Sequence, residues 1–250
     1  YANITDLFAE LDKILSQHPH RFFRIGTGEL ADSLSLEHLT HLSSFLVPYF
    51  SKWPNAILEL KTKSTLIDNL LNLEHRGRTV VSWSLNAESI AQTEEPRSPS
   101  VEERLVAARK CQEAGYKLGF HFDPLIHYPG WEQGYRNVVD KIFEYVDPES
   151  IAWISLGAFR YPPQLEAIIR QRHPQSPIVY GELFPGKDGK LRYFKPIRIE
   201  MFKRVLERIR EYDKSVFVYL CMESPEVWRK VFGWVPEGKN KLSRLLDDRV

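Results

Sequence analysis

Short apolar runs recur along this chain of 250 residues, and each ends in polar or small residues just before a helical pattern. The polar ends lie at positions 26–29, 61–63, 84–86 and 121–123. Strands that alternate with helices at this spacing pair in parallel through right-handed crossovers, so their carboxyl ends meet at one edge of the sheet. The sequence therefore predicts an α/β fold, a closed or half-closed barrel, in which successive strand ends share one ligand site.

The period of the apolar residues predicts the individual elements. We expect strands at 22–25, 56–60, 79–85, 117–122 and 151–156, and helices at 4–17, 36–50, 66–74, 101–114, 130–146 and 163–172. A loop is expected at 91–100. The alternation then changes to a hairpin at 178–196 with its turn at Asp188-Gly189, a helix at 199–212, a strand at 216–221 and a helix at 225–232. We expect a single domain over 1–250 whose tail, 236–250, is loose.

Composition narrows the class of protein. The net charge of +1 gives no broad basic face, so nucleic-acid binding would depend on local clusters. Two cysteines, Cys111 and Cys221, are too few for a disulfide framework or an iron–sulfur cluster, and they indicate a reducing compartment. No signal peptide or long apolar run is present, so we expect a cytoplasmic protein without a membrane partner. The chain opens at Tyr1 without a methionine, and we expect a further segment upstream.

The first three strand ends carry groups that suit a ligand with an amino-acid part. Lys63 can bind a carboxylate and Glu29 an ammonium group, while Ser84 and Asn86 can bond hydroxyls. The cofactor-binding candidates are therefore Thr27, Gly28, Glu29, Lys63, Ser84 and Asn86. Solvation of Lys63 and Glu29, or an ion pair between them, is the alternative.

The fourth and last strands add three more candidates. His121 and Asp123 lie two residues apart on one strand and so share a face, where they are expected to form a hydrogen-bonded pair or to bind substrate. Acid–base catalysis by the two in an unrelated barrel enzyme stays open, but their spacing supplies no third or fourth metal ligand. Cys221 ends the last strand and is either a small buried hydrophobe or a hydrogen-atom donor in radical chemistry.

The expected hairpin interleaves basic and aromatic residues. Such a pattern can hold phosphates while it stacks bases, although a solvated hairpin is the alternative. The substrate-binding candidates here are Lys190, Arg192 and Tyr193.

Four motifs resemble the spore photoproduct lyase family of radical S-adenosylmethionine (SAM) proteins. They are Lys61-Thr62-Lys63, Ser82-Trp83-Ser84-Leu85-Asn86, the run 114–120, and Gly130-Trp131-Glu132-Gln133-Gly134-Tyr135-Arg136. The resemblance extends from about Arg21 to Gly233. It implies a partial (β/α)6 barrel that binds a [4Fe-4S] cluster and SAM, whose reductive cleavage yields a 5′-deoxyadenosyl radical.

The resemblance also implies roles for single residues. Lys63 would meet the SAM carboxylate, Ser84 and Asn86 its amino-acid or ribose part, and the turn at 26–29 its amino group, while the hairpin at Arg192-Tyr193 would lie against DNA. The family's cluster loop, CxxxCxxC, is expected upstream of Tyr1, so this chain holds no metal ligands.

One further departure concerns the hydrogen-donor cysteine of the family. Its position is Gly26 in this chain, and Cys221 is a conjectural substitute. We therefore expect a relative of the family with a different DNA or nucleotide-like substrate. As oligomeric state, we expect a monomer. A non-catalytic nucleic-acid-binding barrel module is the alternative.

Overall fold

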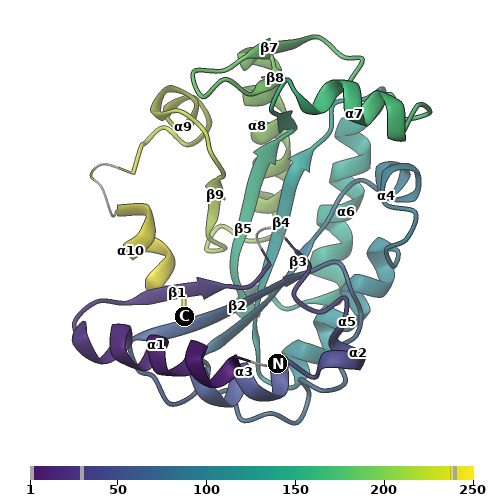
Figure 1. The fold of residues 1–250 in the computed structure, drawn as a ribbon. Helices are drawn as coiled ribbons and strands as arrows, with labels where there is room; N and C mark the ends of the chain where they lie inside the picture. The colour runs from purple at the N-terminus through teal and green to yellow at the C-terminus, as the bar shows by residue number, and fades with distance from the viewer. Residues whose placement is uncertain (1–2, 29–30, 237, 239–240) are drawn as a thin grey trace.

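The computed structural model describes residues 3–28, 31–236, 238 and 241–250. Six parallel strands form one sheet that curls into a half-barrel (Figure 1), which confirms the predicted fold class. In spatial order the strands are β1 (Phe23–Gly26), β2 (Ala56–Thr62), β3 (Thr79–Ser84), β4 (Lys117–Leu125), β5 (Ile151–Ala158) and β9 (Val218–Leu220). Neighbours along the sheet are neighbours along the chain except for β9, which arrives after a long excursion.

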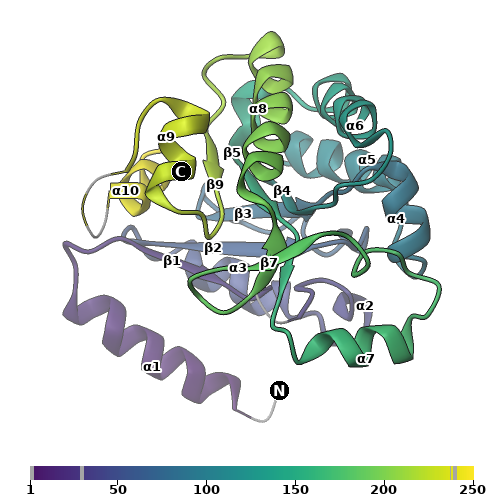
Figure 2. The same ribbon diagram turned by 90° about the horizontal axis from the view of Figure 1, so that it is seen from above.

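Helices cover the outer side of the sheet, as the view from above shows (Figure 2). They are α1 (Ile4–Gln17), α3 (Ser43–Phe50), α5 (Val101–Glu113), α6 (Trp131–Tyr145) and α8 (Lys195–Tyr212). Other helices are α2 (Glu37–Thr40), α4 (Glu88–Glu94), η1 (Pro148–Ser150), α7 (Leu165–Arg172), α9 (Pro225–Phe232) and α10 (Lys241–Asp247). The outward apolar side chains of the strands pack against these helices and form the main core.

Local signals explain where two of the helices begin. Ser100 and Glu103 form a reciprocal capping box at the start of α5, and Ser224 accepts a hydrogen bond from Val227 at the start of α9. Gly233 ends α9 in the left-handed conformation, with φ of 78°. These capped helices begin where the sequence predicts.

The predicted hairpin belongs to a second, antiparallel sheet. Its order is β6 (Arg160–Tyr161), β8 (Leu191–Tyr193) and β7 (Leu183–Pro185), and the turn between β7 and β8 contains Asp188-Gly189 as expected. Figure 1 shows this sheet at the top of the molecule, beyond the upper ends of β4 and β5.

Three expected elements differ from the structure. The helix expected at 36–50 is two helices, because His41 ends α2 in the left-handed conformation. The helix expected at 66–74 is a series of turns whose backbone bonds span three residues, as from Leu70 to Ile67. The loop expected at 91–100 includes the second half of α4.

The described end of the tail, 241–250, is not loose, in contrast to the prediction. Within it, α10 packs its apolar side against the amino-terminal ends of the strands on the inner side, where Leu246 contacts a cluster that includes Ile57 and Val80. Arg24 Nε on β1 lies 3.0 Å from Asp247 Oδ1 and anchors the helix. Three leucines among the charges of this segment supply the apolar side.

We predict that Leu246→Ala lowers the free energy of unfolding by about 2 kcal/mol, because the side chain is 3% exposed and its removal leaves a cavity. Urea denaturation followed by circular dichroism measures the change. Leu66→Ala is the control, since Leu66 is 37% exposed and its loss should stay within about 0.5 kcal/mol. Equal effects of the two substitutions would show that α10 is not anchored.

Candidate active site on the inner face of the half-barrel

A hydrogen-bonded network crosses four strands on the inner face of the sheet. Glu59 Oε1 accepts from Ser82 Oγ at 2.8 Å and lies 2.9 Å from His121 Nε2. The other ring nitrogen of His121, Nδ1, lies 2.6 Å from Ser155 Oγ. Alternate residues of a strand face one side, so the helices take the apolar set and the inner face takes this polar set. We call Glu59, Ser82, His121 and Ser155 the inner-face network.

The network keeps its carboxylate ionised in spite of burial. Burial opposes the charge on Glu59, but the hydrogen bond and the positive field of His121, with the Ser82 hydroxyl, together lower the pKa of Glu59 below its usual value. Burial also raises the pKa of the nearby Tyr219 phenol on β9. The inner face therefore carries a fixed negative charge surrounded by hydrogen-bond donors.

Asp123 belongs to a second group, at the rim beside β9. Arg160 Nη1 lies 2.9 Å from Asp123 Oδ1, and Arg160 Nη2 lies 3.5 Å from Cys221 Sγ. We call Asp123, Arg160 and Cys221 the rim cluster. A side chain at Gly157 would collide with the Asp123 carboxylate and force it out of this position. The pair expected between His121 and Asp123 is therefore wrong: each has found a partner on another strand.

The surroundings of Cys221 favour the protonated thiol. Burial, and secondarily the Asp123 carboxylate, raise the pKa of the Cys221 thiol to about 11. Cys111 is instead fully buried within α5, and burial raises its pKa to about 12. Only Cys221 adjoins the candidate site.

The ends of β1 and β2 are fastened together by Asp32. Its carboxylate accepts from the Thr62 hydroxyl at 2.6 Å and from the backbone N–H of Lys63 at 2.6 Å. In the same loop, a side chain at Gly28 would approach the carbonyl oxygen of Lys61 to 2.5 Å. Gly28 thus permits a close approach of two backbones. Thr27 bonds Ser33 through its hydroxyl at 2.8 Å.

Lys63 and Ser84 lie at adjacent strand ends and share a support from α5. Lys63 Nζ lies 3.4 Å from Glu95 Oε1, and its side chain is 38% exposed. Arg104 binds the other oxygen of Glu95 at 2.7 Å and the carbonyl oxygen of Ser84 at 2.9 Å. The structure therefore brings Thr27, Gly28, Lys63 and Ser84 to one side of the rim, and Ser84 pairs in register with His121.

Two of the cofactor-binding candidates cannot be grouped with these four. Asn86 is buried, and its amide oxygen accepts from the Tyr135 hydroxyl at 2.6 Å while its nitrogen donates to the carbonyl oxygen of Pro124. The side chain therefore holds α6 and the end of β4 in place. Glu29 lies outside the described residues.

The hairpin candidates point in different directions. Arg192 lies on one face of β8 and pairs with Asp188 at 2.5 Å. Tyr193 faces the core and is buried, so its ring is not accessible for stacking against a base. Burial raises the pKa of the Tyr193 phenol to about 12. Lys190 follows the turn and is half-buried. Alternate residues of β8 face opposite sides, and Tyr193 is on the side that faces the core. This burial conflicts with the substrate role expected for Tyr193.

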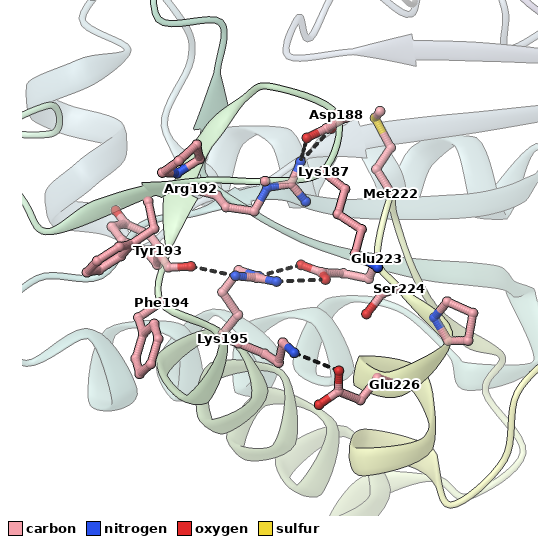
Figure 3. Close-up of a pocket in the computed structure, with 15 residues that line it drawn as sticks. Lys187, Asp188, Arg192, Tyr193, Phe194, Lys195, Met222, Glu223, Ser224 and Glu226 are labelled. Atoms are coloured by element: carbon pink, nitrogen blue, oxygen red, sulfur yellow. Dashed lines mark hydrogen bonds and ion pairs between the residues drawn. The ribbon is translucent and has the colours of Figure 1, made fainter.

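A cavity of about 610 Å³ lies between this hairpin and the start of α9 (Figure 3). Arg198 is among its lining residues, with Nε 2.7 Å from Glu223 Oε1, and Lys195 pairs with Glu226 at 2.6 Å. Its apolar lining includes three exposed side chains, Phe184, Phe194 and Met222.

The described part of the chain contains no group of three histidine, cysteine or acidic side chains placed to hold a metal ion. None of its helices combines the length and the apolar character that a membrane crossing requires.

Several residues of the site were not predicted, namely Asp32, Glu59, Glu95, Arg104 and Arg160. One of them carried a sequence signal: Glu59 interrupts the apolar strand Ala56-Ile-Leu-Glu-Leu60, and a carboxylate at such a position must find a partner. The remaining four lie in loops, in a helix or on the two-residue strand β6, where a charged side chain is unremarkable in the sequence.

A parallel half-barrel whose inner face is polar, and whose strand ends carry a lysine and hydroxyls, defines an α/β protein of the radical SAM type. The family model for spore photoproduct lyase matches residues 1–208 of the chain. The chain belongs to the spore photoproduct lyase family.

Individual relatives agree with this assignment. Spore photoproduct lyase of a Geobacillus species is 30% identical over 237 residues, which cover 93% of this chain and 67% of that protein. The Bacillus subtilis enzyme is 27% identical over 185 residues, covering 73% of this chain and 54% of that protein.

Solved structures of the lyase superpose closely. A mutant of spore photoproduct lyase gives a TM-score of 0.81 at 26% identity, covering 88% of this chain and 68% of that chain. A double mutant with bound AdoMet and dinucleoside spore photoproduct gives 0.80 at 26% identity, with the same coverage.

We predict that Cys221 reacts slowly with iodoacetamide at pH 8 and that its rate keeps rising to about pH 11, because only the thiolate is nucleophilic. Peptide mapping by mass spectrometry after timed labelling measures the rate for each cysteine. Cys111 is the internal control and should stay unlabelled until the protein unfolds. A rate for Cys221 that levels off near pH 8.5 would contradict the assigned environment.

Proposed function

We propose that the protein binds SAM across the ends of β1, β2 and β3, with Lys63 at its carboxylate, and acts on a DNA or nucleotide-like substrate. The observation that carries this proposal is the convergence of Lys63 and Ser84 at adjacent strand ends, beside the loop of Thr27 and Gly28. A related structure holds AdoMet and a dinucleoside spore photoproduct together, which supports the choice of both ligand classes.

The residues present fit one of the two cofactors that the family implies. A half-exposed ammonium group suits a carboxylate, and the Ser84 hydroxyl suits a polar group of SAM. The two cysteines do not suit a [4Fe-4S] cluster, since one lies inside α5 and the other at the end of β9. SAM, when bound and reduced, supplies a radical that abstracts hydrogen; this chain contributes binding and orientation.

The substrate is proposed to face the inner-face network and the rim cluster. Glu59 and His121 offer a charged acceptor and a ring nitrogen on the inner face, while Arg160 and Asp123 lie at the rim. The Cys221 thiol is held protonated, which suits hydrogen-atom donation because that step breaks an S–H bond and forms a C–H bond. The sulfur radical left behind would regain hydrogen from an external thiol.

We predict that the full-length protein, reconstituted anaerobically with iron and sulfide, forms 5′-deoxyadenosine from SAM. Chromatography of the quenched reaction measures the product. Lys63→Gln should raise the SAM concentration for half-maximal rate by roughly tenfold, the effect of one lost charged hydrogen bond.

Lys203→Gln is the matched control, because Lys203 is exposed on the outer helix α8 and should leave the rate unchanged. An absence of 5′-deoxyadenosine with the unmodified protein would exclude the radical reaction. The non-catalytic nucleic-acid-binding module would then be the better reading.

We predict that Lys190→Ala weakens DNA binding and lowers the slope of log K against log salt by about 1, since one phosphate contact is lost. Fluorescence anisotropy with a short duplex at several salt concentrations gives the slope. Lys214→Ala is the control, because Lys214 is exposed in the loop between α8 and β9. Equal slopes for both variants would remove the hairpin turn from the DNA interface.

A further inference from the structure

Arg104 is a buried residue that supports two of the proposed SAM contacts, Ser84 directly and Lys63 through Glu95. It lies on α5, is fully buried, and donates to three separate segments. Nη1 donates to the carbonyl oxygen of Ser84 at 2.9 Å, Nε to that of Pro99 at 2.9 Å, and Nη2 to Glu95 Oε2 at 2.7 Å. A buried guanidinium requires such acceptors. Arg104 therefore fixes both the end of β3 and the Glu95 carboxylate.

The Glu95 carboxylate is shared between two cations. Its second oxygen, Oε1, lies 3.4 Å from Lys63 Nζ. Two positive groups and one negative group give this triad of Lys63, Glu95 and Arg104 a formal net charge of +1. Lys63 is the most exposed member, at 38% against 12% and 0% for the side chains of Glu95 and Arg104. The surplus positive charge is therefore presented to a ligand by Lys63.

The nearby carboxylate of Asp32 is occupied elsewhere. One oxygen accepts from Thr62 Oγ1 at 2.6 Å and from the backbone N–H of Leu34 at 2.9 Å, and the other accepts from the backbone N–H of Lys63 at 2.6 Å. Among the described residues, the ion pair of the Lys63 ammonium group is with Glu95.

We propose that Arg104 is a positioning residue for the carboxylate of the ligand. By holding one oxygen of Glu95, it prevents Glu95 from neutralising Lys63, yet leaves Glu95 close enough to orient the ammonium group. A lone Lys63–Glu95 pair would be neutral and would attract a carboxylate weakly, whereas the triad attracts it. This inference rests on the proposed SAM site.

Three substitutions separate the charge of the triad from its packing. Arg104→Gln makes the formal charge zero, Glu95→Gln makes it +2, and the double substitution restores +1 on Lys63 alone. Replacing both members of a buried ion pair by neutral groups is commonly tolerated better than removing one. A structural role for Arg104 would make the double variant at least as defective as Arg104→Gln.

The experiment measures binding of SAM and of decarboxylated SAM to the full-length, cluster-loaded protein by equilibrium dialysis. The dissociation constant of decarboxylated SAM divided by that of SAM reports the contribution of the ligand carboxylate. A general loss of structure changes both constants alike and leaves this ratio unchanged. We expect Arg104→Gln to reduce this ratio by about threefold to tenfold, Glu95→Gln to increase it, and the double variant to return it close to the original value. The Glu95→Gln result stands even where Arg104→Gln fails to fold.

Lys63→Gln distinguishes the inference from the proposed function. Should Lys63→Gln leave the ratio unchanged, the SAM carboxylate lies elsewhere, and both the proposed site and the role of Arg104 are wrong. Should Lys63→Gln reduce the ratio while Arg104→Gln and Glu95→Gln leave it unchanged, the site stands and the inference about Arg104 is overturned. A double variant that is no better than Arg104→Gln overturns it as well.

Discussion

The hydrogen bonds from Glu59 to Ser82 and His121, and from His121 to Ser155, are the interaction on which the inner face depends. Their four residues come from four adjacent strands, so the network ties β2, β3, β4 and β5 together on the inner face, where α10 covers only the amino-terminal ends of the strands. A partly buried carboxylate without these partners would destabilise the sheet. The network thus makes a polar interior compatible with a stable sheet.

The same principle extends to the rim, where three charged side chains bind groups on other segments of the chain. Asp32 joins the ends of β1 and β2, Arg104 joins α5 to the end of β3, and Arg160 joins β6 to the end of β4. Lys63 is the half-exposed cation in this arrangement. These contacts therefore hold the three side chains in place, and the Lys63 ammonium group stays accessible to an anionic part of a ligand.

The sequence predicts the sheet better than it predicts the partners within it. Apolar period and caps indicate strands and helices because both depend on residues close in the chain, as at Ser224 and Gly233 in α9. The partner of His121 is Glu59, 62 positions away in the sequence. The nearness of Asp123 on the same strand did not predict this partner. Tyr193 and Asn86 carry suitable chemistry, but their burial depends on tertiary packing that local pattern does not encode.

The most direct test is a crystal structure of the full-length, cluster-loaded protein with SAM. The account predicts that the SAM carboxylate lies within hydrogen-bonding distance of Lys63 Nζ, with the ligand extending along the strand ends past Ser84 toward the inner face. Density for SAM in the cavity between the hairpin and α9, or anywhere distant from Lys63, would contradict it.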